Sequence, residues 1–158
     1  MKFLFICTHN RCRSILSEAI TNDLGQGRIT AVSAGSAPVG EVHPLSLKYL
    51  TEKNISTKGL ISQSWNEFEA DQPDVVITVC DSAAAETCPI WFGNCAKVHW
   101  GLTDPSKLEG SDEEIKAAFF TVMHIIKTRT QAALKLDLEN MSQIQQQAAL
   151  NKIATEIN

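Results

Sequence analysis

Apolar residues along this chain fall into two patterns, short continuous runs and longer stretches with helical spacing. The continuous runs, rich in β-branched and aromatic residues, predict strands buried on both faces over residues 2–6, 29–34, 75–79 and 96–100. Helical spacing predicts helices over residues 14–24 and 44–54, after residue 111 and from about residue 142, with a short helical turn over Trp65–Glu69. Because strands and helices alternate, we expect an α/β fold, a four-stranded parallel sheet with helices on both faces.

Several residues mark where the predicted helices begin and end. Gly25 is placed to stop the first helix, and Pro44 suits the first turn of the second. Ser111 and Glu114 have the spacing of a capping box at the start of the third. With 158 residues and no internal repeat or linker, the whole chain is predicted to form one domain around one core.

The charge and hydropathy of the chain argue against several classes of function. Its net charge is −4, so no basic field is available to hold nucleic acid or an anionic membrane surface. The apolar runs are too short to span a bilayer, and the first residues lack the pattern of a signal peptide. We therefore expect a cytoplasmic protein without nucleic-acid or membrane partners.

The cysteine content points to nucleophilic or redox chemistry. The five cysteines are an odd number in a chain without an export signal, which argues against a permanent disulfide framework. No Cys-x-x-Cys pair is present and the histidines are scattered, so we expect neither a structural metal nor another cofactor. The cysteines are Cys7, Cys12, Cys80, Cys88 and Cys95.

The segment from Cys7 to Ser14 carries the most chemistry. It joins the first predicted strand to the first predicted helix, and such a turn binds anions because backbone N–H groups and the helix dipole converge there. A cysteine in that position is stabilised as a thiolate nucleophile. Arg13 adds a fork of donors that fits two oxygens of a tetrahedral oxyanion. Ser14 can cap the helix and also donate a hydrogen bond to the thiolate.

Two later segments are expected at the same edge of the sheet. Residues 80–95 and 101–106 each follow a predicted strand, and ligands of parallel sheets bind beyond the carboxyl ends of the strands. Asp104 precedes a proline, which restricts its backbone to an extended conformation. The sequence alone leaves open whether this is a simple Asp-Pro turn or a catalytic carboxyl.

These motifs resemble the low-molecular-weight tyrosine phosphatase family. The resemblance rests on Cys-x-x-Asn-x-Cys-Arg-Ser after an N-terminal strand, from Cys7 to Ser14, and on the later Asp104-Pro105. Within that family the chain resembles the arsenate reductase branch, through Val79-Cys80-Asp81, Cys88-Pro89 and His99-Trp100-Gly101. The resemblance covers about residues 1–135 and leaves about residues 140–158 as a helical extension.

The resemblance implies a role for each residue of the first loop. Cys7 would be the nucleophile and Asp104 the general acid that protonates a leaving oxygen. Asn10 would brace the loop in a left-handed conformation, which asparagine tolerates. Cys12 would serve packing. The oxyanion would be bound by the loop as a whole: Thr8, His9, Asn10, Arg11, Cys12 and Arg13.

Cys80 and Cys88 favour the reductase branch, because reducing As(V) takes two electrons from thiols. A fully helical path from residue 80 to residue 88 would separate their Cα atoms by about 12 Å. A disulfide needs them within roughly 7 Å, so Asp81–Thr87 must bend or unwind, with Gly93-Asn94 as a possible hinge. The expected substrate is arsenate, with phosphate or sulfate as mimics. Thioredoxin is the first choice of reductant, and glutathione with glutaredoxin is the second.

Two other functions stay open at this point. A phosphatase acting on phosphotyrosine through a Cys7 phosphoenzyme would use the same loop and the same Asp104. Against it, Ser106-Lys107 stands where phosphatases of the family often have tyrosines, and Tyr49 lies in a predicted helix. The third hypothesis is a redox-sensing or anion-binding protein without turnover, which would have no need of a general acid.

Overall fold

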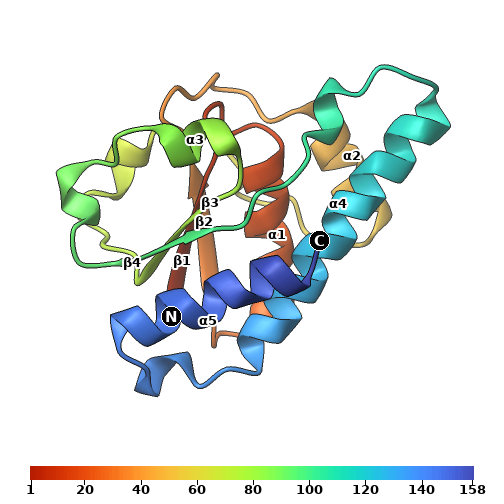
Figure 1. Cartoon of the computed structure of the whole chain (residues 1–158). Helices are drawn as coiled ribbons and strands as arrows, with labels where there is room; N and C mark the ends of the chain where they lie inside the picture. The colour runs from red at the N-terminus through yellow and green to blue at the C-terminus, as the bar shows by residue number, and fades with distance from the viewer.

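The computed structural model describes residues 1–158 and has a four-stranded parallel sheet at its centre (Figure 1). The strands are β1 (Lys2–Ile6), β2 (Thr30–Ala34), β3 (Val75–Thr78) and β4 (Ala96–His99), in the order β2-β1-β3-β4. The predicted sheet is confirmed. The boundaries differ by single residues, since β2 begins one residue later than predicted and β3 and β4 each end one residue earlier.

The central position of β1 explains why its sequence is apolar throughout. Phe3 to Ile6 pair with β2 on one edge and with β3 on the other. Successive side chains of a strand point to opposite faces, so the burial of all four residues shows that both faces are covered. Phe3, Leu4 and Phe5 are completely buried. Because all four strands are parallel, their carboxyl ends lie at one edge and deliver the following loops to the same place.

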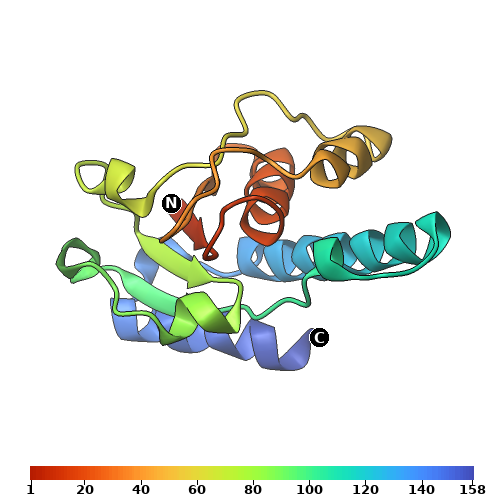
Figure 2. The same ribbon diagram turned by 90° about the horizontal axis from the view of Figure 1, so that it is seen from above.

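Five α-helices surround the sheet: α1 (Arg13–Gly25), α2 (Pro44–Glu52), α3 (Asp81–Ala85), α4 (Asp112–Leu134) and α5 (Gln143–Glu156). Figure 2 shows α1 and α4 on one side of the sheet and shorter helical turns on the other. The turns there include η1 (Trp65–Phe68) and η2 (Ile90–Phe92), joined by edge-to-face packing of Trp65 on Phe92. The capping box of Ser111 and Glu114 is present at the start of α4, as predicted.

The last helix covers the free edge of the sheet. Along β4 the outward N–H groups of Lys97 and His99 donate to the side chains of Gln147 and Asn151, at 3.3 and 3.1 Å. The buried indole of Trp100 donates to the backbone of α5. These bonds satisfy donors that an open edge strand would present to other chains.

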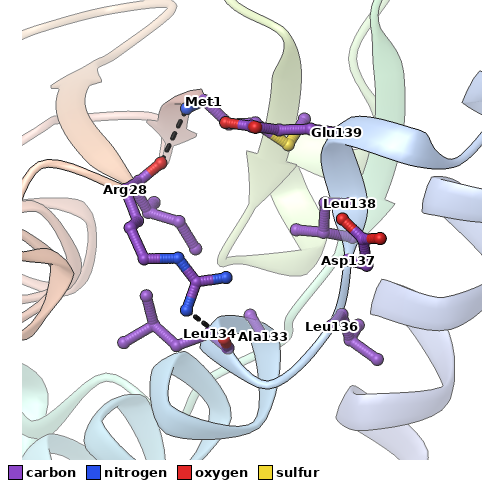
Figure 3. A pocket seen from close by; sticks show the side chains of 9 residues that line it. Met1, Arg28, Ala133, Leu134, Leu136, Asp137, Leu138 and Glu139 are labelled. Atoms are coloured by element: carbon purple, nitrogen blue, oxygen red, sulfur yellow. Dashed lines mark hydrogen bonds between the residues drawn. The ribbon is translucent and has the colours of Figure 1, made fainter.

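A pocket at the opposite end of the sheet is closed by the N-terminus (Figure 3). The amino group of Met1 donates to the carbonyl of Arg28 at 2.7 Å, and the Arg28 guanidinium donates to the carbonyl of Leu134 at 2.9 Å. This pocket measures about 120 Å³ and lies at the amino ends of β1 and β2, far from the loop that begins at Cys7. None of the helices combines the length and the apolar content that crossing a bilayer requires.

Candidate active site

The loop from Cys7 to Cys12 leaves the carboxyl end of β1 and leads directly into α1. Cys12 is the N-cap residue, and α1 begins at Arg13, one residue earlier than predicted. Ser14 is therefore not the cap of this helix. Its hydroxyl is free to face Cys7, the predicted nucleophile, and Ser14 Oγ lies 2.9 Å from Cys7 Sγ in a buried contact.

The side chain of Asn10 fixes the loop through three hydrogen bonds on the side away from the pocket. Its backbone is left-handed, with φ of 46°, as the sequence predicts. Its Nδ2 donates to Ser14 Oγ and to Ser33 Oγ, both at 2.9 Å, and its Oδ1 accepts from the backbone N–H of Gln63 at 2.8 Å. The side chain is fully buried and does not line the pocket, so only the backbone of Asn10 can face a bound anion.

Glu18 extends this network to a carboxyl group. Ser33 Oγ donates to Glu18 Oε2 at 2.6 Å, which links Glu18 through Asn10 and Ser14 to Cys7. Burial raises the pKa of Glu18 to about 7, against the opposing effect of its hydrogen bonds to Ser33. This residue was not predicted from the sequence. The available signal was its position one turn after Ser14 in a predicted helix, since acids are seldom buried without a partner.

The second strand brings a glycine against the loop. A Cβ atom on Gly35 would lie 2.5 Å from the carbonyl oxygen of Thr8 and 3.0 Å from that of Cys7. The next residues continue the contact, since the N–H of Ala37 donates to the same Thr8 oxygen at 2.9 Å. The conformation of the loop thus depends on the absence of a side chain at position 35.

Arg13 and Asp104 meet across the pocket, although they lie 91 residues apart in the sequence. Arg13 Nη2 and Asp104 Oδ2 are 3.1 Å apart, and Arg13 Nη1 donates to the carbonyl of Leu102. The other oxygen of Asp104 accepts from the backbone N–H and the hydroxyl of Ser106, at 3.1 and 2.6 Å. Both predicted residues therefore reach the same pocket, one from the loop after β1 and one from the segment after β4.

The pocket that these residues form has a volume of about 350 Å³. Among its lining side chains Arg11, Arg13 and Lys107 are cationic, and Asp104 is the one carboxylate, so the pocket suits an anion. Four lining residues were not among the predicted site residues: His43, Ser82, Ser106 and Lys107. The complete lining is Cys7, Thr8, His9, Arg11, Cys12, Arg13, His43, Ser82, Asp104, Ser106 and Lys107.

His43 caps α2 with its imidazole and lines the pocket. Its Nδ1 accepts from the N–H of Leu45 at 3.2 Å, so the neutral ring carries its proton on Nε2. Burial lowers the pKa of His43, and the charge of Arg11 lowers it further against the attraction of Asp104. At neutral pH this residue is a neutral donor in a cationic pocket.

Cys80 lies beside the loop, and Cys88 lies further along the same segment. Cys80 Sγ accepts from the N–H of Ala83 at the start of α3, a helix that the sequence analysis did not predict, and lies 3.8 Å from Thr8 Oγ1. The helix ends at Ala85, so the segment to Cys88 is not continuously helical. All five cysteines are free thiols, and Cys88 is partly exposed.

The remaining two cysteines are buried. Burial raises the pKa of Cys12 to about 12, and burial also raises the pKa of Cys95. Cys95 Sγ donates to the carbonyl of Phe92 at 2.8 Å. Both thiols stay protonated at neutral pH, which agrees with the packing roles expected for them. Nowhere in the chain do three or more His, Cys, Asp or Glu side chains come together as a metal site would require.

A family model described as low molecular weight phosphotyrosine protein phosphatase matches residues 2–149. The chain belongs to this family. Among its relatives, an arsenate reductase of Halalkalibacterium halodurans is 35% identical over 79% of this chain and 88% of its own length. A glutaredoxin arsenate reductase of Synechocystis is 32% identical over 82% of this chain and 93% of its own length. A solved structure of an arsenate reductase in the phosphate binding state superposes with a TM-score of 0.69 at 30% identity. The match covers 84% of this chain and 95% of the other.

Aromatic side chains at the pocket would help to bind an aryl substrate, and this pocket has none. No Phe, Tyr or Trp lines the pocket. Tyr49, the single tyrosine of the chain, lies in α2 as predicted, is 3% exposed and packs against Phe119 with ring centroids 5.0 Å apart.

Proposed function

We propose that this protein reduces arsenate to arsenite with electrons from its own cysteines. The observation that carries the proposal is the position of Cys80, whose sulfur lies beside Thr8 of the anion-binding loop while Cys88 follows on the same segment. An oxyanion site with one thiol would suffice for a phosphatase. The additional thiols are what a two-electron reduction needs. Relatives named arsenate reductases support the same conclusion.

In the first step the Cys7 thiolate attacks arsenic and a hydroxide leaves. The loop N–H groups and Arg13 hold the arsenate oxygens, and Ser14 stabilises the thiolate before attack. Asp104 donates the proton that turns the leaving hydroxide into water. Since Arg13 pairs with Asp104, an oxyanion that engages Arg13 competes with this ion pair.

In the second step the Cys80 thiolate attacks the sulfur of Cys7. The sulfur–arsenic bond breaks and its electron pair stays on arsenic, which leaves as arsenite, As(III). A disulfide between Cys7 and Cys80 remains. Cys80 Sγ lies 3.8 Å from the hydroxyl of Thr8, the residue next to Cys7, so the attacking sulfur starts beside the loop.

In the third step the Cys88 thiolate attacks Cys80 and releases the Cys7 thiolate. The disulfide now joins Cys80 and Cys88, on a segment where Cys88 is partly exposed. An external dithiol reduces it by exchange. We propose thioredoxin as the first choice, since a protein dithiol resolves the mixed disulfide that it forms, and glutathione with glutaredoxin as the second. Reduction assays with each donor alone distinguish the two.

The second candidate is a phosphatase that hydrolyses phosphotyrosine through a Cys7 phosphoenzyme. Membership of the family and the pairing of Arg13 with Asp104 favour it, because phosphate and arsenate have nearly the same shape. The test is kcat/KM for arsenate with a thiol donor against kcat/KM for p-nitrophenyl phosphate. The proposal expects arsenate to be favoured at least 100-fold, because no aromatic side chain lines the pocket to bind the phenyl ring. A preference for the aryl ester would overturn it.

A further inference from the structure

Glu86 lies between the two relay cysteines in the sequence and contacts the anion-binding loop. It is the first residue after α3, is partly buried, and its Oε1 accepts a hydrogen bond from Thr8 Oγ1 at 3.3 Å. The same Thr8 hydroxyl lies 3.8 Å from Cys80 Sγ. A single hydroxyl group therefore joins the loop, the carboxylate and the second cysteine of the relay.

The Thr8 hydroxyl can donate one hydrogen bond, and the partner that receives it decides the direction of the contact with Cys80. A carboxylate can only accept a hydrogen bond, so Thr8 donates its proton to Glu86. At the contact between Thr8 and Cys80 the thiol must then be the donor.

We propose that Glu86 is a positioning residue that holds the Cys80–Cys88 segment against the loop in the dithiol form. It acts through Thr8 and does not touch the reacting atoms. The inference rests on the proposed function, since it concerns the disulfide that the relay would form. It assigns the Thr8–Glu86 bond to the dithiol form of the Cys80–Cys88 pair.

The Thr8–Glu86 bond is assigned to the dithiol form because forming the disulfide would move the segment that contains Glu86. Cys80 and Cys88 are free thiols in this structure, so the Thr8–Glu86 bond is observed in the dithiol form. A disulfide holds its two Cα atoms within roughly 7 Å, and we expect α3 and the residues after it to rearrange as the disulfide forms. Glu86 is two residues from Cys88 and moves with it. The Thr8–Glu86 bond is therefore lost on oxidation, and its contribution stabilises the dithiol against the disulfide.

The test is a redox equilibrium of the Cys80–Cys88 pair in the full chain carrying Cys7→Ser, which prevents a disulfide to Cys7. The protein is equilibrated with reduced and oxidised dithiothreitol. The two thiols lose two protons and two electrons, and the S–S bond of oxidised dithiothreitol takes them up as it breaks. Alkylation followed by peptide mass spectrometry counts the Cys80–Cys88 disulfide at each ratio.

We expect Glu86→Ala to shift the equilibrium toward the disulfide by about fivefold, which corresponds to a potential about 20 mV more negative. Glu86→Gln keeps an acceptor for the Thr8 hydroxyl but loses the charge, so it should fall between Glu86→Ala and the parent. The matched control is Thr87→Ala, the next residue, whose exposed side chain has no hydrogen-bond partner on the loop. It should leave the equilibrium unchanged. In a Thr8→Val background, Glu86→Ala should have no further effect, because the bond is already missing.

Each failure has its own signature. If no Cys80–Cys88 disulfide forms at any ratio in the parent protein, the relay is wrong and the role of Glu86 falls with it. If the disulfide forms but Glu86→Ala matches the parent, or Thr87→Ala shifts the equilibrium equally, the role of Glu86 is overturned while the relay stands. An undiminished effect of Glu86→Ala in the Thr8→Val background also overturns it.

Discussion

At the scale of single residues, the site is a chain of hydrogen bonds that ends on the Cys7 sulfur. Ser14 contacts that sulfur, and Asn10 fixes Ser14 while joining it to Ser33. Glu18 terminates the chain with a partly buried carboxyl group. The residues that line the pocket are thus positioned by polar side chains that lie outside it.

Glu18 makes the stability of the protein depend on pH. Burial raises its pKa from the ordinary 4.5 to about 7, so between these values the folded chain binds more protons than the unfolded chain. The contribution of Glu18 to stability must therefore fall as pH rises through this range, by up to about 3 kcal/mol at 1.36 kcal/mol per pKa unit. We predict that Glu18→Gln removes this decline, because an amide does not ionise.

The measurement is the free energy of unfolding by urea at pH 5 and pH 8, compared between the parent and Glu18→Gln. Asp23→Asn is the matched control, an exposed carboxylate on the same helix that should retain the decline of the parent. If Glu18→Gln follows the parent at both pH values, Glu18 is ionised at pH 5 as any exposed carboxylate would be.

At the scale of elements, the loop is shaped by the strand beside it as much as by its own sequence. Gly35 follows β2, and its backbone packs so closely on the carbonyl of Thr8 that no side chain would fit between them. The following residues bond to the loop directly, with the N–H of His43 donating to the carbonyl of Arg11 at 2.9 Å. Changes near β2 should therefore alter anion binding without touching the pocket.

We predict that Gly35→Ala raises KM for arsenate at least tenfold and lowers stability by about 1–3 kcal/mol, because the new methyl group displaces the Thr8 carbonyl. Steady-state kinetics and thermal unfolding check the two effects. Gly25→Ala is the control, since a Cβ there makes only an ordinary contact at 3.7 Å from Ile29. An unchanged KM in Gly35→Ala would show that the loop tolerates the displacement.

The elements also show where sequence patterns suffice. The strands were predicted to within one residue because each is a continuous apolar run that a buried parallel strand requires. The helix α3 was missed because five residues are too few to show a helical period. Its start depends on the thiol of Cys80 as a cap, which is an unusual capping group.

At the scale of the whole molecule, parallel topology is what assembles the site. Cys7, Cys80 and Asp104 each follow a different strand, and the sheet brings the three segments to one edge. Their convergence could be predicted from strand order alone. Glu18, Ser33 and Gln63 could not, because their contacts with the loop depend on side-chain packing between elements distant in the sequence.

The central claim is that the oxidising equivalents of arsenate pass from Cys7 to the Cys80–Cys88 pair. The most direct measurement is a thiol count on the fully reduced protein after one equivalent of arsenate, without any external thiol, with the disulfide mapped by mass spectrometry. The account predicts the loss of two thiols of five, one equivalent of arsenite, and a disulfide between Cys80 and Cys88. Five remaining thiols, or a disulfide that excludes Cys80, would contradict it.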